Sequence, residues 1–208
     1  MILFIYNKII MYIILDTETN GLPDSKGLRY GEYPNYKIMN KYDTARVIQL
    51  SYMICDNKLN QNELVDNIIY AENFEINNPI FHGITNEISQ KDGYSFDNVI
   101  NIFYNKIQKC EKIIAHNVNF DINVLKSELY RRKLFHIIIE LEKKELICSV
   151  KKFKNIVKAK NKYNRIKDPS LKELYKFAFN KELENAHNSK YDVINLHAAI
   201  KKITNGEL

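Results

Sequence analysis

The 208-residue sequence has few cysteines, no internal repeat and no long uninterrupted apolar run. Cys55, Cys110 and Cys148 lie far apart, without the spacing of a metal site or the even number of a disulfide framework. We therefore expect reduced, mostly buried thiols in a protein that is intracellular and not secreted. The absence of a repeat excludes a solenoid or a propeller.

The first fifteen residues, MILFIYNKIIMYIIL, are apolar but do not have the features of a membrane or signal segment. Asn7 and Lys8 interrupt the run, which is too short to span a bilayer. No basic segment precedes it, and no cleavage site of small residues follows it. We predict no membrane partner, a short extension over residues 1–11 and one domain over residues 12–208.

The charge balance fits a polyanionic partner without requiring one. Lysine and arginine number 31 against 25 acidic residues, a net charge of +6. Their positions say more than their number, because residues 143–167 hold ten of them against the single acid Glu145. They are Lys143, Lys144, Lys151, Lys152, Lys154, Lys158, Lys160, Lys162, Arg165 and Lys167. The cluster favours a phosphate-facing surface over a merely solvated helix face.

The apolar pattern alternates between strand and helix periodicity. It predicts strands at 12–16, 46–55, 63–72, 112–116 and 145–150, and helices at 95–110, 120–134, 170–179 and 191–203. The first three strands can form a meander, and helix and strand alternate after them. This order predicts an α/β fold with a mixed central β-sheet flanked by helices.

A long insertion loop without periodicity is expected over residues 23–45. Tyr30, Tyr33, Tyr36 and Tyr42 alternate there with lysine and arginine. Such a loop can guide a single nucleic acid strand by stacking and charge. We favour the alternative, a surface flap packed by its own tyrosines.

Acidic residues follow the predicted strands at three places. Asp16 and Glu18 are two residues apart, so they point to the same face and repel each other unless a cation lies between them. Asp121 falls in the first turn of a helix, where an acid is also favoured by the helix dipole. Asp192 matches a capping-box-like arrangement with Ser189, which leaves His187 unexplained. A divalent cation with oxygen ligands is the simplest account of the first pair.

Together these segments resemble a known family. DTE at 16–18, HNVNFD at 116–121 and HNSKYD at 187–192 are similar to the three motifs of the DEDDh 3′-to-5′ exonucleases, which have a ribonuclease H-like fold. This group includes the proofreading subunit of bacterial DNA polymerase III. FHGIT at 81–85 resembles the family's His-Gly-Ile segment, and the histidine five residues before Asp192 matches the histidine subtype.

The resemblance implies a metal-dependent exonuclease that releases nucleoside monophosphates from 3′ ends. Four carboxylates, those of Asp16, Glu18, Asp121 and Asp192, would hold two Mg²⁺ or Mn²⁺ ions, and His187 would be the general base. The residues expected to bind the terminal nucleotide are Thr17, Leu22, Phe81, His82, Asn117 and Phe120. A core position is an equally good interpretation of Phe120.

The expected partner is a single-stranded or frayed 3′ end of DNA or RNA, with DNA favoured, and a polymerase is a possible protein partner. Two other functions remain open on the sequence. One is an RNA-trimming exoribonuclease, because the chemistry at phosphorus is the same. The other, less favoured, is a non-catalytic nucleic-acid-binding module on the same fold.

Overall fold

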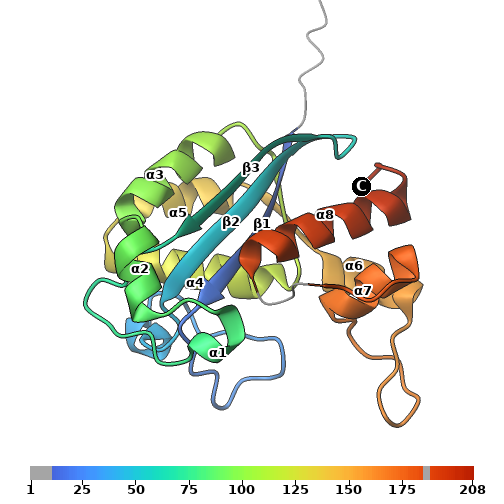
Figure 1. Ribbon diagram of the computed structural model, residues 1–208, viewed down its shortest axis with the longest axis horizontal. Coiled ribbons are helices and arrows are strands. Elements are labelled where there is room, and N and C mark those ends of the chain that lie inside the picture. The colour runs from blue at the N-terminus through green and yellow to red at the C-terminus, as the bar shows by residue number, and fades with distance from the viewer. Residues whose placement is uncertain (1–10, 185–187) are drawn as a thin grey trace, which may run out of the picture.

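The computed structural model describes residues 11–184 and 188–208, which form one five-stranded sheet with helices on both faces (Figure 1). The strand order is β3-β2-β1-β4-β5. The strands are β1 (Met11–Thr19), β2 (Val47–Asp56), β3 (Gln61–Ile68), β4 (Lys112–Ala115) and β5 (Glu145–Cys148). β1, β2 and β3 are antiparallel neighbours, whereas β4 is parallel to β1 and β5 to β4. The mixed sheet predicted from the sequence is confirmed.

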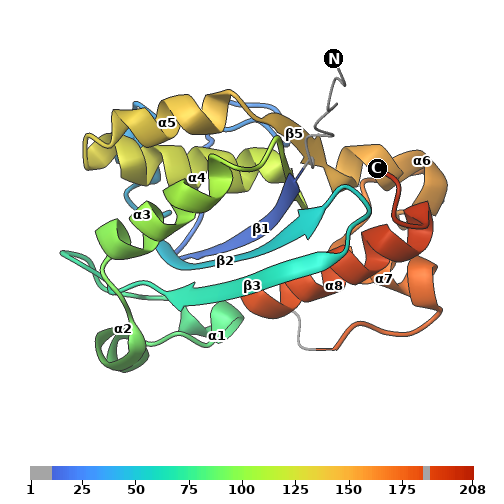
Figure 2. The same cartoon turned by 90° about the horizontal axis from the view of Figure 1, so that it is seen from above.

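Two groups of helices cover the two faces of the sheet (Figure 2). One face carries α3 (Phe96–Ile107), α4 (Val118–Arg131) and α5 (Phe135–Glu142). The other carries α6 (Ser149–Val157), α7 (Leu171–Phe179) and α8 (Ser189–Thr204). The short helices α1 (Pro79–His82) and α2 (Asn86–Asp92) follow β3, and a 3-10 turn, η1 (Met39–Tyr42), lies in the insertion loop.

The alternation of side chains along β1 assigns each face its core. Ile13 and Leu15 are fully buried in the cluster formed with α3, α4 and α5. Tyr12 and Ile14 are buried in the cluster formed with α6, α7 and α8. Each fully buried apolar side chain stabilises the fold by about 1.5–3 kcal/mol, so a shift of β1 by one residue would be costly on both faces.

Several element boundaries differ from the sequence predictions. β1 continues to Thr19, beyond the predicted 12–16, because β2 pairs with it along this whole length. β3 ends at Ile68 instead of 72, and β5 ends at Cys148, after which α6 begins. The sequence analysis did not predict α5 and α6, which are eight and nine residues long. Ser170 and Glu173 form a capping box at the start of α7, within the predicted helix.

The insertion loop packs mainly through its own tyrosines. The Tyr42 side chain is buried, and its hydroxyl donates to the Pro34 carbonyl at 2.6 Å. Tyr33 and Tyr36 contact aromatic rings of α4 edge-on, with centroids 5.8 and 6.0 Å apart. Tyr30 alone of the four is almost fully exposed, at 95%. The flap interpretation therefore holds for three tyrosines, and Tyr30 remains available for contact.

The cysteines are free thiols, as expected. Cys55 and Cys110 are buried, and Cys148 is half-buried. Burial raises the pKa of Cys55 to about 12 and that of Cys110 to about 11. In the part of the chain that the structure describes, no helix is long and apolar enough to cross a membrane.

Candidate active site

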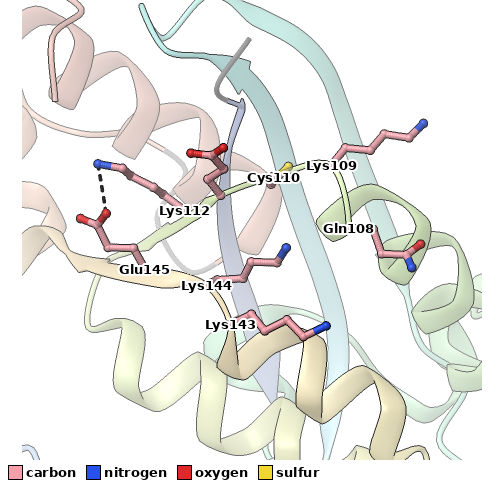
Figure 3. Close-up of a pocket in the computed structure, with 8 residues that line it drawn as sticks. Gln108, Lys109, Cys110, Lys112, Lys143, Lys144 and Glu145 are labelled. Carbon is pink, nitrogen blue, oxygen red and sulfur yellow. Dashed lines mark ion pairs between the residues drawn. The ribbon is translucent and has the colours of Figure 1, made fainter. Parts of the chain in front are cut away.

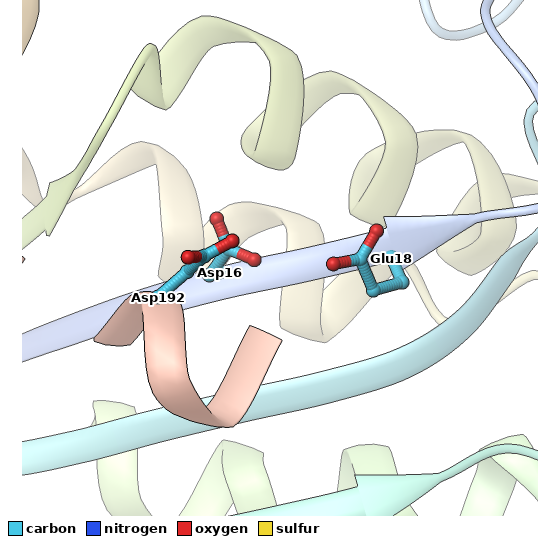
Figure 4. Close-up of side chains that lie close together, drawn as sticks. All are labelled: Asp16, Glu18 and Asp192. Carbon is cyan, nitrogen blue, oxygen red and sulfur yellow. The ribbon is translucent and has the colours of Figure 1, made fainter. Parts of the chain in front are cut away.

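Three carboxylates meet where β1 passes the start of α8 (Figure 4). Asp16 and Glu18 continue the series of Tyr12 and Ile14, so they point to the face that α8 covers. Asp192 comes from the first turn of α8. One oxygen from each of the three carboxylates can be chosen so that all lie within 4.8 Å of one another. The two acids near the end of β1 and the acid of the third motif therefore lie together.

Asp121 approaches the same part of β1 from the opposite face. Thr17 continues the other series, that of Ile13 and Leu15, and points to the face that α4 covers. Its amide and its hydroxyl both donate to Asp121 Oδ1, at 3.0 and 2.9 Å. These two bonds fix the Asp121 carboxyl beside the strand, close enough for its charge to raise the pKa of Asp16.

Burial and neighbouring charges raise the pKa values of the acids in this site. Burial raises the pKa of Asp16 well above its usual range, and the charges of Asp121, Asp192 and Glu18 raise it further. Burial and the charges of Asp192 and Asp121 raise the pKa of Glu18 to about 7. Burial also raises the pKa of Asp121 to about 7, against the lowering effect of the Thr17 hydrogen bonds.

No lysine or arginine within residues 11–184 and 188–208 forms an ion pair with Asp16, Glu18 or Asp121. Full ionisation of the site at neutral pH therefore calls for added positive charge. Carboxylate oxygens are the donors that Mg²⁺ and Mn²⁺ prefer. The donor set thus fits the divalent metal that the resemblance implies.

The start of α8 corrects one sequence prediction. Asn188 is the N-cap, and Ser189 is already the first helical residue. The Ser189 hydroxyl lies 2.6 Å from the Ser51 hydroxyl of β2 and does not cap the helix. The capping-box interpretation of Ser189 and Asp192 is wrong, because this hydroxyl anchors α8 to the sheet. The anchor holds the helical turn from which Asp192 projects.

A polar strip beside the acids escaped the sequence analysis. Ser51 and Gln49 pair directly with Asp16 and Glu18 across the β1–β2 ladder. Both side chains donate to Asp66 Oδ1 of β3, at 2.7 and 2.8 Å, so the Ser189 hydroxyl donates to Ser51. The sequence signal was Gln49 and Ser51, two polar residues within the apolar run VIQLSYMIC. Their hydrogen-bond partners could not be predicted, because Asp66 and Ser189 are remote in the sequence.

Two of the predicted nucleotide-binding residues contact the insertion loop. Asn117 is the N-cap of α4 with a left-handed backbone, at φ 73°. Its side-chain amide donates to the Tyr33 hydroxyl at 2.7 Å. Phe120 packs between the core and the Tyr33 ring. The structure thus places both residues at the junction of α4 and the loop.

Three other residues predicted to bind the nucleotide differ in solvent exposure. Leu22 and Phe81 are exposed, at 73% and 68%, whereas His82 is buried. His82 Nδ1 accepts from the Ile84 amide at 3.1 Å, so its proton is on Nε2, which has no partner among the described residues. Burial lowers the pKa of His82 and favours this neutral form. His187 lies outside the described residues, and its role stays a prediction.

Known structures share this fold. The E. coli Exonuclease I complex with a dA16 oligonucleotide superposes with a TM-score of 0.69 at 15% identity, covering 94% of this chain and 41% of that chain. The complex with a dT13 oligonucleotide has a TM-score of 0.70 at 16% identity, with the same coverage. Exonuclease I from Methylocaldum szegediense has a TM-score of 0.70 at 16% identity, covering 94% and 40%. The chain therefore spans about two fifths of these proteins.

The ribonuclease H-like fold predicted from the sequence is confirmed by this likeness. No curated protein sequence matches the chain significantly. A family model described as an exonuclease matches residues 13–200. This match supports the predicted DEDD-type exonuclease class, while a specific likeness to the polymerase III subunit stays a prediction. Since the match spans residues 13–200, which include α4, most of β1 and α8, and all four acids, the chain belongs to the RNase_T exonuclease family.

Proposed function

We propose that the chain is a divalent-metal-dependent 3′-to-5′ exonuclease that hydrolyses terminal phosphodiester bonds and releases nucleoside monophosphates. The convergence of Asp16, Glu18 and Asp192 within 4.8 Å carries this proposal. Family membership supports the reaction class. We also infer that residues 12–208 are the exonuclease domain and that residues 23–45 are an insertion in it.

In this mechanism the Asp16, Glu18, Asp121 and Asp192 carboxylates would hold two Mg²⁺ or Mn²⁺ ions. Bound there, such ions would supply stabilisation of negative charge on the reacting phosphate and on the attacking and leaving oxygens. The protein keeps its ligands rigid before substrate arrives. Thr17 holds the Asp121 carboxyl, and the Ser51–Ser189 bond holds the first turn of α8. Such preorganisation lowers the cost of assembling four like charges at the moment of reaction.

His187 is proposed as the general base that takes a proton from the attacking water. An imidazole suits this task because its unperturbed pKa is near 6.5. It stands five residues before Asp192, one of the proposed metal ligands, in the sequence.

The terminal nucleotide is proposed to lie against Thr17, Leu22, Phe81, His82, Asn117 and Phe120. The exposed Leu22 and Phe81 side chains offer apolar contact to a base, and His82 Nε2 offers a hydrogen-bond donor. DNA is the favoured substrate, because two of the similar structures hold dA16 and dT13 oligonucleotides. A polymerase partner stays a prediction of the resemblance alone.

The test uses 20-nucleotide single strands of DNA and RNA, each labelled at the 3′ or the 5′ end, with Mg²⁺ or with EDTA. We expect mononucleotide release from the 3′ label first, faster on DNA, and none with EDTA. The Asp92→Asn variant is the matched control for Asp→Asn substitutions in the site, since Asp92 is exposed at the end of α2, outside the proposed site. Release that survives EDTA, or that begins at the 5′ label, contradicts the proposal.

A further inference from the structure

A groove of about 830 Å³ opens between the insertion loop and the α6–α7 region. The insertion loop contributes Tyr30 and Tyr33 to its lining, and the α6–α7 region contributes Lys151, Lys154 and Lys167, here called the basic wall. Asn117 lines it as well, bonded to Tyr33 and one helical turn before Asp121. The groove therefore reaches the turn of α4 that leads to Asp121.

His116 also lines the groove, with both ring nitrogens hydrogen-bonded. His116 Nε2 donates to the Pro169 carbonyl at 3.1 Å, and its Nδ1 accepts from the Ser149 hydroxyl at 2.8 Å. Burial lowers the pKa of His116 to about 4, so the ring is neutral at physiological pH. These bonds join the end of β4 to both segments of the basic wall.

The basic wall has charge available for an anion. Lys151 forms no ion pair in the described part of the chain. Lys154 pairs with Asp168 at 2.8 Å and Lys167 with Glu173 at 2.6 Å, in pairs whose side chains are 35–42% exposed. Exposed pairs of this kind contribute about 0–1 kcal/mol, so both lysines can exchange a carboxylate for a phosphate.

Beyond the groove the wall continues into a basic hairpin, residues 158–167, closed by a bridge between Lys160 and Ile166. This hairpin protrudes from the body next to α6 and α7 (Figure 1). Four of its cations are exposed and, among residues 11–184 and 188–208, have no acidic partner: Lys158, Lys160, Lys162 and Arg165. Tyr163 is 69% exposed there, with the Lys162 ammonium 5.0 Å from its ring centroid.

In a second lysine-rich hollow, three of the four lysines pair with acids (Figure 3). There Lys112 pairs with Glu145 at 3.2 Å, and Lys144 pairs with Glu140 at 2.6 Å. Lys143 shares the same Glu140. The basic stretch predicted from the sequence thus divides into a first part matched by acids and a second part, from Lys151 onward, that lies along the groove and the hairpin.

We propose that the groove and the basic hairpin form a binding track for single-stranded nucleic acid. The 3′ end of the strand lies in the active site, and the rest of the strand extends along this track. This proposal rests on the function proposed above. Phosphates contact Lys151 and then the hairpin cations, while unpaired bases stack on Tyr30 and Tyr163. Stacking on exposed aromatic rings together with a basic groove is the usual means of holding a single strand without sequence preference.

The first experiment measures binding of 20-nucleotide DNA and RNA strands by fluorescence anisotropy in EDTA at several salt concentrations. In the variant Lys160→Gln/Lys162→Gln/Arg165→Gln, the slope of log affinity against log salt should fall in magnitude by about 2, at roughly 0.7 for each cation removed. The control variant Lys58→Gln/Lys109→Gln/Lys202→Gln removes three exposed lysines at the opposite end of the sheet or of α8. Its slope should equal that of the wild type, and an equal fall in both variants overturns the proposal.

The second experiment compares kcat/KM for a 20-nucleotide strand with that for a dinucleotide, which is too short to reach the hairpin. Tyr30→Ala should lower the ratio of the two roughly 5- to 100-fold, the range for loss of one stacking contact, and Lys151→Gln should lower it less. Circular dichroism checks that each variant is folded. If the wild type binds strands in EDTA but hydrolyses neither substrate with Mg²⁺ or Mn²⁺, the proposed function fails while the track stands. If it hydrolyses both and no track variant changes the ratio or the salt slope, the track is wrong.

Discussion

Helix α4 carries two buried carboxylates on one side, Asp121 and Glu128, two turns apart and 2% and 3% exposed. Glu128 forms a two-pronged ion pair with Arg46, whose Nε meets one carboxylate oxygen and whose Nη2 lies 3.2 Å from the other. Asp121 instead accepts two hydrogen bonds from Thr17 and lies near Asp16. One helix therefore holds an acid with its own cation and an acid surrounded by other acids.

The difference separates a scaffold contact from a site that calls for a ligand. A buried charge is costly unless an opposite charge compensates it. For Glu128 the protein supplies that charge through Arg46, and the ion pair connects α4 to the residue that precedes β2. For Asp121 and its neighbours, the compensating charge is proposed to arrive as metal. The following variants test this distinction.

The largest effect is expected on activity. Asp16→Asn or Asp192→Asn should lower kcat/KM for a 3′-labelled single strand by roughly 100- to 1000-fold or more, the range seen when one preorganised electrostatic contact is lost. Glu128→Gln, assayed under conditions where it is folded, should retain most activity. Wild-type rates in either Asp variant would refute the site assignment.

The largest effect on stability is expected at the scaffold pair. Glu128→Gln leaves the Arg46 guanidinium buried without its anion and should lower the free energy of unfolding by roughly 3–5 kcal/mol. Urea unfolding of the metal-free protein measures this. Arg46→Met combined with Glu128→Leu should recover most of the loss, since both charges are then absent. A loss below 1 kcal/mol in Glu128→Gln would show that the pair contributes little.

Metal should stabilise the protein through the acid site. At a Mg²⁺ concentration 100 times its Kd, the gain is about 2.7 kcal/mol, which raises the Tm of a chain of this size by roughly 5–10 °C. Asp16→Asn should abolish most of this rise at pH 8, whereas the control Asp92→Asn should keep it. Differential scanning calorimetry gives the shifts.

The pH dependence of the metal-free protein follows from the raised pKa values of Glu18 and Asp121, both about 7. When the pKa of a carboxyl is higher in the folded state than in the unfolded state, the group stabilises the fold at a pH below its unfolded-state pKa, which is near 4. This stabilisation is lost as the pH rises through the folded-state pKa of about 7. The Tm in EDTA should therefore fall between pH 4 and 7, and less so in Asp121→Asn. Because protons and metal compete for these oxygens, the Mg²⁺ effect should be larger at pH 8 than at pH 5. A flat wild-type profile in EDTA would argue against the raised values.

The smallest effect concerns the anchor of α8. Ser189→Ala removes the bond to Ser51 and should cost about 1 kcal/mol of stability. A modest fall in activity should accompany it, since Asp192 sits on the same turn. Ser95→Ala, which removes the N-cap of α3, is a matched control with a similar stability loss and wild-type activity. Equal activity of the two variants would show that the anchor does not position Asp192.

The order of the residues in the chain was enough to predict the sheet and most of its acid site. Alternation from Tyr12 to Glu18 sends two acids to one face and Thr17 to the other, because successive side chains on a strand point in opposite directions. The same local rule allowed the apolar strands to be predicted from the sequence. The resemblance to the exonuclease motifs then predicted Asp121 and Asp192 as further members of the site, although no local rule says that they meet.

Only the tertiary structure decided which partner each polar group takes. Ser189 looked like a helix cap but bonds to Ser51, 138 residues away, and Arg46 compensates Glu128 across the core. The groove needs both Tyr30 and Lys151 in its lining, from segments far apart in the chain. Periodicity is a property of neighbouring residues, so the sequence by itself determines which face a side chain takes. Contacts between distant segments depend on how the helices pack on the sheet, and that packing decides which charges are balanced and which remain available for a ligand.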